Sequence, residues 1–121
     1  MKRIILLAFL CTTTLVMAQR INHVQEAIAN YDYEAALTLI AKEKPTIPLL
    51  LQKGKAQRGL GMNTEALSTY QEIITNDTAN TRAYIEAAEC CRSLAKYQQA
   101  LKYYEQALDL NPENKYVRIQ Y

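Results

Sequence analysis

The sequence predicts an all-α fold in which antiparallel helix pairs stack into an α-solenoid, and three observations support this prediction. Residues 81–114 read as two amphipathic helical patterns joined by a short break and closed by Asn111-Pro112. Residues 47–80 repeat the same pattern at a constant offset. Half of the 121 residues are hydrophobic and only three are glycine and three proline, a composition typical of a folded helical chain.

The offset between the two stretches is 34 residues, and the match extends to individual side chains. Pairs such as Gly54/Ala88 and Gly61/Ala95 are small in both copies. A 34-residue period with helix–turn–helix content is the signature of the tetratricopeptide repeat (TPR), and the chain resembles a TPR protein. Identical residues occupy six paired positions: Arg58/Arg92, Leu60/Leu94, Ala66/Ala100, Leu67/Leu101, Tyr70/Tyr104 and Asn80/Asn114.

The resemblance implies how each repeat packs. The family places small residues where the two helices cross, so that their backbones approach closely, and aromatic residues where space between turns must be filled. In the earlier repeat Asn63, Ile73 and Thr78 replace the turn aromatic, the last small residue and the closing proline. The later repeat matches the whole pattern, in order, at Tyr84, Ala88, Ala95, Tyr97, Ala100, Tyr104, Ala107 and Pro112.

Residues 1–18 have the anatomy of a secretory signal peptide. Lys2-Arg3 precede an apolar run that continues to Met17, and Ala18 offers a small residue at a cleavage site before Gln19. We therefore predict cleavage after Ala18 and export to the periplasm or cell envelope, as in the bacterial envelope TPR proteins that the chain resembles. The alternative is an uncleaved membrane anchor, which three consecutive threonines and the short apolar run disfavour.

The predicted mature domain, residues 19–121, begins with a degenerate repeat at residues 20–46. Apolar residues at helical spacing predict a first helix from Arg20 to Asn30. Asp32 is a candidate N-cap for a second helix that ends near Glu43, before Pro45. Terminal repeats are commonly atypical because one side faces solvent, so we interpret this region as an N-terminal capping repeat.

The remaining helices follow from the two regular repeats, residues 47–80 and 81–114. Pro48 suits a first helical turn, and Gly59 and Gly61 are expected to end that helix, one of them in a left-handed conformation. Asn63 or Thr64 is expected to cap the next helix. The predicted helices cover residues 48–60, 64–75, 81–94 and 97–110, and a partial one covers residues 115–121.

Charge and residue types argue against several function classes. Removing Lys2 and Arg3 with the signal leaves equal numbers of basic and acidic side chains, so nothing calls for nucleic acid. We expect no metal and no cofactor, because thiols and imidazoles do not occur at ligand spacing in residues 19–121. His23 lacks an evident nucleophile or orienting group, and is expected to be a solvated helical residue. The chain is therefore predicted not to be an enzyme.

Two further residue groups need an interpretation. Cys90 and Cys91 are adjacent on one helix, where a disulfide would distort the backbone, and Cys91 is expected to be a small buried hydrophobe. A reactive Cys90 thiol is the remaining enzymatic alternative. Tyrosines at family packing positions are expected in the core: Tyr70, Tyr84, Tyr97 and Tyr104. Those outside these positions suit an interface: Tyr31, Tyr33, Tyr103 and Tyr116.

The resemblance also implies a binding groove, because the first helix of each repeat lines the concave side of a TPR solenoid. The Lys, Asn and Arg set with which some family members grip a C-terminal carboxylate is not matched, since Lys55 and Glu89 stand where an asparagine is expected. A peptide or protein segment of acidic character is the expected partner. In the simpler alternative, Lys55 and Glu89 pair across a solvated groove. The predicted groove residues are Leu51, Lys55, Arg58, Arg82, Ile85, Glu89 and Arg92.

Two functions therefore remain open from the sequence. The chain is either an exported protein–protein interaction scaffold, or the N-terminal structural spacer of a longer envelope protein whose activity lies beyond residue 121. A membrane partner is expected only through an uncleaved signal segment.

The predicted helix over residues 81–94 carries two acidic residues three positions apart, Glu86 and Glu89. We expect them to form surface ion pairs with Arg82 and Arg92, each one turn away.

Overall fold

The computed structural model describes residues 2–120, with side chains from residue 12 onward except at positions 116, 119 and 120. This range forms seven helices: α1 (Lys2–Ala29), α2 (Tyr33–Ile40), α3 (Ile47–Gly59), α4 (Asn63–Asn76), α5 (Thr81–Ser93), α6 (Tyr97–Leu110) and α7 (Lys115–Gln120). None of them, over the described residues, is both long enough and apolar enough to span a lipid bilayer.

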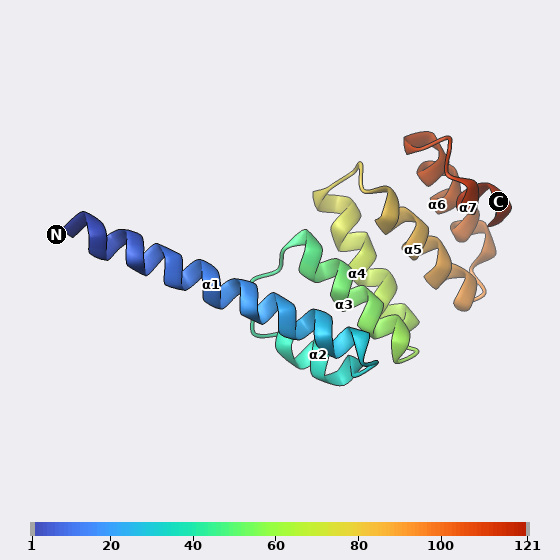
Figure 1. Ribbon diagram of the computed structural model, residues 1–121. Coiled ribbons are helices and arrows are strands. Elements are labelled where there is room, and N and C mark those ends of the chain that lie inside the picture. The colour runs from blue at the N-terminus through green and yellow to red at the C-terminus, as the bar shows by residue number, and fades with distance from the viewer. Residues whose placement is uncertain (1, 121) are drawn as a thin grey trace.

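The helices form three consecutive antiparallel pairs that stack side by side (Figure 1). Each helix packs on the one before it, and α7 lies against α6. The turns within pairs lie along one edge of the stack, and the loops between pairs lie along the other (Figure 1). The predicted all-α solenoid of two regular repeats, one degenerate repeat and a partial last helix is confirmed.

The first helix is longer than predicted, because it begins at Lys2 rather than near Arg20. Neither glycine nor proline occurs between Lys2 and Ala29, so no helix-breaking residue interrupts α1. The N-terminal part of α1 extends away from the stacked helices (Figure 1), and the side chains of residues 12–23 are exposed. This part of α1 therefore contributes little to the core, whether or not it is cleaved.

Side-chain capping explains where four of the other helices begin. The Asp32 carboxylate accepts a hydrogen bond from the Ala35 amide at 3.2 Å, as predicted. Thr46, Asn80 and Asn114 cap α3, α5 and α7 in the same way. The predicted cap of α4 is wrong: α4 begins at Asn63 itself, and Met62 precedes it without a side-chain cap. The second helix also ends earlier than predicted, at Ile40.

The helix pairs bury two hydrophobic cores that meet at α3. The first core lies between α1, α2 and α3 and consists of Val24, Ile28, Ala36, Ile40, Leu49 and Ala56. The second core lies between α3 and α7 and includes Leu50, Ala66, Leu67, Tyr70, Ile73, Tyr84, Cys90, Cys91, Ala100, Tyr104 and Val117. Leu49 and Leu50 are consecutive, so α3 serves one core with each of two faces.

The predicted burial of the tyrosines is correct for Tyr70, Tyr84 and Tyr104, which lie in the second core. It is wrong for Tyr97, whose side chain is 64% exposed. Tyr97 is the first residue of α6 and lies at the solvent-facing edge, at the turn within the third pair. Its position in the family pattern does not bury it.

Glycines at two positions of α3 allow aromatic rings to approach the backbone. A Cβ atom at Gly54 would lie 2.4 Å from Cζ of Tyr70, and one at Gly59 would lie 2.4 Å from Cε2 of Tyr33. Real Cβ atoms do not approach other heavy atoms so closely, because dispersion contacts turn repulsive well before that distance. The two rings therefore occupy the space that the Cβ atom of any other amino acid would need at positions 54 and 59.

All three turns within pairs close their first helix with the same hydrogen-bonded motif. The residue after the cap has a positive φ, namely Tyr31 (59°), Gly61 (75°) and Ala95 (59°). In each motif the next amide donates to the carbonyl five residues back, as in Asp32 to Ala27 at 2.8 Å. This is the Schellman arrangement, in which glycine is strongly preferred. The left-handed glycine that the sequence predicted is Gly61.

Candidate binding groove

The predicted groove residues lie on α3 and α5, the first helices of the second and third pairs. Leu51 and Ile85 are half-buried against the second core. Lys55, Arg82 and Arg92 are exposed, while Arg58 and Glu89 are half-buried. The structure thus brings cationic and apolar side chains together on the first helices of neighbouring pairs.

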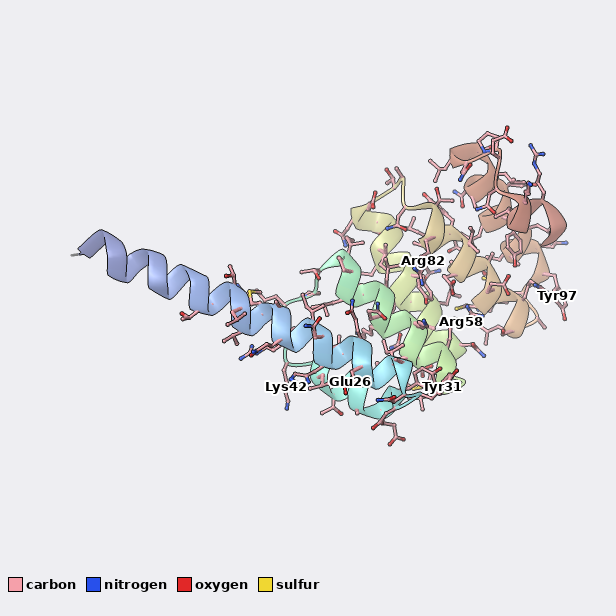
Figure 2. The ribbon with its side chains drawn as sticks, in the orientation of Figure 1. Glu26, Tyr31, Lys42, Arg58, Arg82 and Tyr97 are labelled. Atoms are coloured by element: carbon pink, nitrogen blue, oxygen red, sulfur yellow. The ribbon has the colours of Figure 1, made fainter. Side chains whose placement is uncertain are left out.

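Arg58 is engaged in an ion pair that joins two repeats. Its guanidinium donates to the carboxylate of Glu86 on α5, and the two side chains are 31% and 24% exposed. Burial alone would lower the pKa of Arg58, but the charge and hydrogen bond of Glu86 outweigh it, so the net pKa is raised. Arg58 therefore helps to hold the second and third pairs together. Figure 2 shows Arg58 and Arg82 in the central part of the solenoid.

The acidic residues of α5 are paired differently from what the sequence predicted. Glu86 pairs with Arg58 from the preceding repeat, rather than with Arg82 one turn away. Glu89 does contact Arg92, at 3.5 Å, and it also accepts a hydrogen bond from the Tyr104 hydroxyl on α6. Burial and this hydrogen bond raise the pKa of Tyr104 to about 12, so the hydroxyl remains a donor at neutral pH. Both carboxylates are thus tied to the framework of the groove.

Cys90 and Cys91 are both free and buried, which confirms the interpretation of Cys91 as a small core residue. Burial raises the pKa of the Cys90 thiol to about 11, so the thiolate that attacks electrophiles is scarce at neutral pH. The burial of Cys90 therefore argues against a reactive thiol, and its low reactivity is a prediction. His23 is 66% exposed, in agreement with its interpretation as a solvated residue.

We expect native Cys90 to react with iodoacetamide at pH 7 at least about tenfold more slowly than in the urea-unfolded chain, because its thiol is both buried and protonated. Mass spectrometry of timed reactions, read at the peptide carrying Cys90, measures the two rates. Comparable rates before and after unfolding would contradict the assignment of Cys90 to a closed core.

A cleft that the sequence did not reveal lies at the N-terminal end of the groove. It has a volume of about 280 Å³ and lies between α1 and α3, the first helices of the first two pairs. Tyr31 from the turn between α1 and α2 lines it, as does Tyr33, the first residue of α2, together with Ile28 and Lys55. Both tyrosines lie outside the family packing positions and were therefore predicted to suit an interface, but nothing in the sequence indicated that they share a cleft with α3.

A larger cleft of about 610 Å³ lies beside the N-terminal part of α1. Thr12, Thr13, Val16 and Met17 form part of its wall, opposite the loop between α2 and α3. These four residues belong to the segment predicted to be removed as a signal peptide. Cleavage after Ala18 would therefore take away one side of this cleft.

The fold defines the class of protein as an all-α helical-repeat protein. The sequence model of the tetratricopeptide repeat family matches residues 81–114. The chain thus contains a tetratricopeptide repeat and has the TPR type of α-solenoid. Human "Tetratricopeptide repeat protein 6" is 30% identical over 89 residues, which cover 74% of this chain and 16% of that relative. The chain thus spans about a sixth of the relative's length.

Solved TPR structures are similar over most of the chain. PcrH, known from Pseudomonas aeruginosa, in complex with the chaperone binding region of PopB has a TM-score of 0.77 at 18% identity, covering 87% of this chain and 90% of that one. The first TPR of Spaghetti (RPAP3), bound to the HSP90 peptide SRMEEVD, has a TM-score of 0.77 at 21% identity, covering 82% of each chain. The Arabidopsis OM64 TPR domain has a TM-score of 0.75 at 18% identity, covering 81% and 84%. These identities establish a shared fold.

Proposed function

We propose that the chain is an exported protein–protein interaction scaffold that binds a partner peptide or protein segment of acidic character in its concave groove. The observation that carries this proposal is the surface formed by α3 and α5. Exposed cations at Lys55, Arg82 and Arg92 lie among the half-buried apolar residues Leu51 and Ile85. Such a mixture binds an extended segment through carboxylate contacts and apolar burial together.

The solved structures support a protein partner. Two proteins of the same fold hold a peptide or a chaperone-binding region, as their complexes with PopB and with the HSP90 peptide record. For the present chain we propose an internal acidic segment, because the residue set that grips a C-terminal carboxylate is not matched at Lys55 and Glu89. Glu86 and Glu89 already engage Arg58 and Arg92, which makes exposed Lys55 and Arg82 the natural anchors for ligand carboxylates.

The proposed site of action is the periplasm or cell envelope. The proposal rests on the charged start, the short apolar run and the small residue at position 18, which together are typical of a cleaved signal. The packing of the solenoid is compatible with it, because the side chains of residues 12–18 are all exposed and outside both cores. Removal of residues 1–18 would leave Val24 and Ile28 in place to hold α1 on α2.

Reversing the charge of Arg82 is expected to weaken partner capture at least about tenfold, because one charge-assisted hydrogen bond contributes roughly 1.5–3 kcal/mol. The experiment expresses the full-length chain with a C-terminal tag in its native cells and quantifies the co-purified protein. Arg82→Glu is compared with Lys102→Glu, which makes the same charge change at an exposed position of α6, a second helix. The mass of the purified chain reports whether it begins at Gln19.

Each outcome has a clear interpretation. A partner captured by the wild type and by Lys102→Glu, but not by Arg82→Glu, supports the scaffold and its groove. Equal capture by all three chains would contradict the groove. A folded chain that captures nothing would favour the alternative, a spacer within a longer protein. A purified chain that still begins at Met1 would contradict cleavage.

A further inference from the structure

The turn between α1 and α2 departs from the other two turns at one residue. Tyr31, Gly61 and Ala95 occupy the same position of the same Schellman motif, with φ values of 59°, 75° and 59°. A left-handed backbone is unfavourable for a residue with a side chain, and most of all for a bulky one. Two repeats use a small residue at this position, whereas the first repeat carries an aromatic ring there.

The ring of Tyr31 makes few packing contacts that would offset this unfavourable backbone conformation. The side chain is 78% exposed, and its aromatic neighbour is Tyr33, at 6.3 Å between ring centroids in an edge-to-face arrangement. Tyr33 is itself held in place, because its ring lies directly over Gly59 of α3. Figure 2 shows Tyr31 at the turn between α1 and α2, on the same edge of the solenoid as Tyr97. A largely exposed aromatic residue that is kept in an unfavourable conformation points to a function.

The surroundings of Tyr31 indicate what it would contact. Tyr31 and Tyr33 line the cleft of about 280 Å³, which Ile28 on α1 makes partly apolar. Ligand pockets for whole small molecules start at roughly this volume or larger, so the cleft suits one large side chain better. Gln25 and Gln52 add side-chain amides on opposite walls, and amides can bond to the main chain of an extended peptide.

Charge further narrows the ligand class. Lys55 is the one charged residue among the described residues that line the cleft, and it is exposed. Arg82, the second residue of α5, is a further exposed cation on the first helix of the next pair. A carboxylate close to the inserted side chain would be attracted by Lys55, whereas a basic residue would be repelled.

We propose that this cleft is the anchoring site of the groove, and that it receives an aromatic side chain of an acidic peptide segment. Tyr31 and Tyr33 pack against the inserted ring, and Lys55 pairs with a carboxylate beside it. Aromatic pairs gain stability beyond the area that they bury, and tyrosine is a frequent centre of binding energy at interfaces. The inference rests on the proposed function and adds to it the ligand chemistry and the position of the anchor.

The left-handed backbone allows a test that separates binding from folding. Tyr31→Gly removes the ring and also relieves the backbone, so the melting temperature should not fall. Ala95→Gly is the matched control, because it makes the same backbone change at the equivalent turn of the third pair, away from the cleft. Tyr31→Asn is a second variant, since asparagine tolerates this conformation and carries no aromatic ring.

The probe is a fluorescein-labelled peptide in which one phenylalanine is flanked on both sides by glutamates, titrated with the full-length chain and followed by anisotropy. We expect Tyr31→Gly and Tyr31→Asn to bind it at least about tenfold more weakly than wild type, and Ala95→Gly to bind within about twofold. Replacing the phenylalanine of the probe by alanine should weaken binding to a similar extent. Lys55→Gln should weaken binding and reduce its dependence on salt.

The inference is overturned if the wild-type chain does not bind the probe, or if Tyr31→Gly binds it as well as the wild type does. Its failure is distinguishable from failure of the proposed function. Capture of the natural partner that depends on Arg82 but not on Tyr31 would leave the groove standing and place the anchor elsewhere. Capture of the natural partner that depends on neither Arg82 nor Tyr31 would overturn both the proposed groove and the proposed anchoring site.

Discussion

Replacing Gly54 with alanine is expected to lower the free energy of unfolding by about 1–3 kcal/mol, which is the usual cost of forcing extra atoms into a packed core. Gly54 lies inside α3, and its missing side chain makes room for the ring of Tyr70, which is 1% exposed. An added Cβ would lie 2.4 Å from Cζ and 2.7 Å from Cε1 of that ring. Because Tyr70 is surrounded by the second core, neither the ring nor α3 can move aside without opening contacts elsewhere.

The sign of this effect is informative, because helix propensity alone predicts the opposite result. In a helix interior, alanine is more favourable than glycine by roughly 0.8–1 kcal/mol. Urea unfolding of Gly54→Ala measures which effect dominates, and a stabilised variant would contradict the close approach of Tyr70. Tyr70→Leu provides the matched background: without the ring, Gly54→Ala should cost less, and the difference is the coupling energy between the two positions.

Reversing the charge of Arg58 should lower the free energy of unfolding by about 1–3 kcal/mol, between the values typical of exposed and of buried ion pairs. Arg58→Glu breaks the pair with Glu86 and places a second carboxylate beside it, at a site where both side chains are less than one-third exposed. The double variant Arg58→Glu/Glu86→Arg restores opposite charges and should recover much of the loss. Urea unfolding of the three variants and the wild type completes the cycle.

Lys55→Glu is the control for this cycle, because it reverses an exposed charge one turn away on the same helix. It should change stability by less than about 0.5 kcal/mol, as is usual at the surface. If Lys55→Glu lowers the free energy of unfolding as much as Arg58→Glu does, the loss of stability comes from the added negative charge on α3 and not from breaking the Arg58–Glu86 ion pair. The pair also explains why Arg82, and not Arg58, is the better position at which to test partner binding.

The sequence predicted the features that depend on local pattern. The period of 34 residues and the small residues at helix crossings predicted the stacked pairs, and Asp32 and Pro48 predicted where two helices begin. The burial of Tyr70 and Tyr104 followed from their equivalent positions in the two repeats. These properties repeat from one helix pair to the next, so they can be predicted by comparing the repeats within this one sequence.

Features that depend on how one pair sits against the next were not predictable. The pairing of Arg58 with Glu86 spans 28 residues and depends on the rotation between neighbouring repeats. The cleft beside Tyr31 is lined by residues of α1, α2 and α3, and no periodic pattern encodes how these three helices sit against one another. Cleavage after Ala18, the groove residues and the expectation that the chain is not an enzyme or a cofactor binder stay predictions, because they concern processing and partners.

The division of the interior at α3 has a consequence for cooperativity. A solenoid is held together by contacts between neighbours, so its parts can open separately when few contacts join them. In this chain α1 and α2 depend on one core and α4 to α6 on the other, with α3 as the shared element. A peptide seated between α1 and α3 would bind only when the first pair is closed, and so would couple the opening of both parts. Binding of a peptide in this one small cleft would then decide whether the two parts of the solenoid unfold separately or in a single cooperative step.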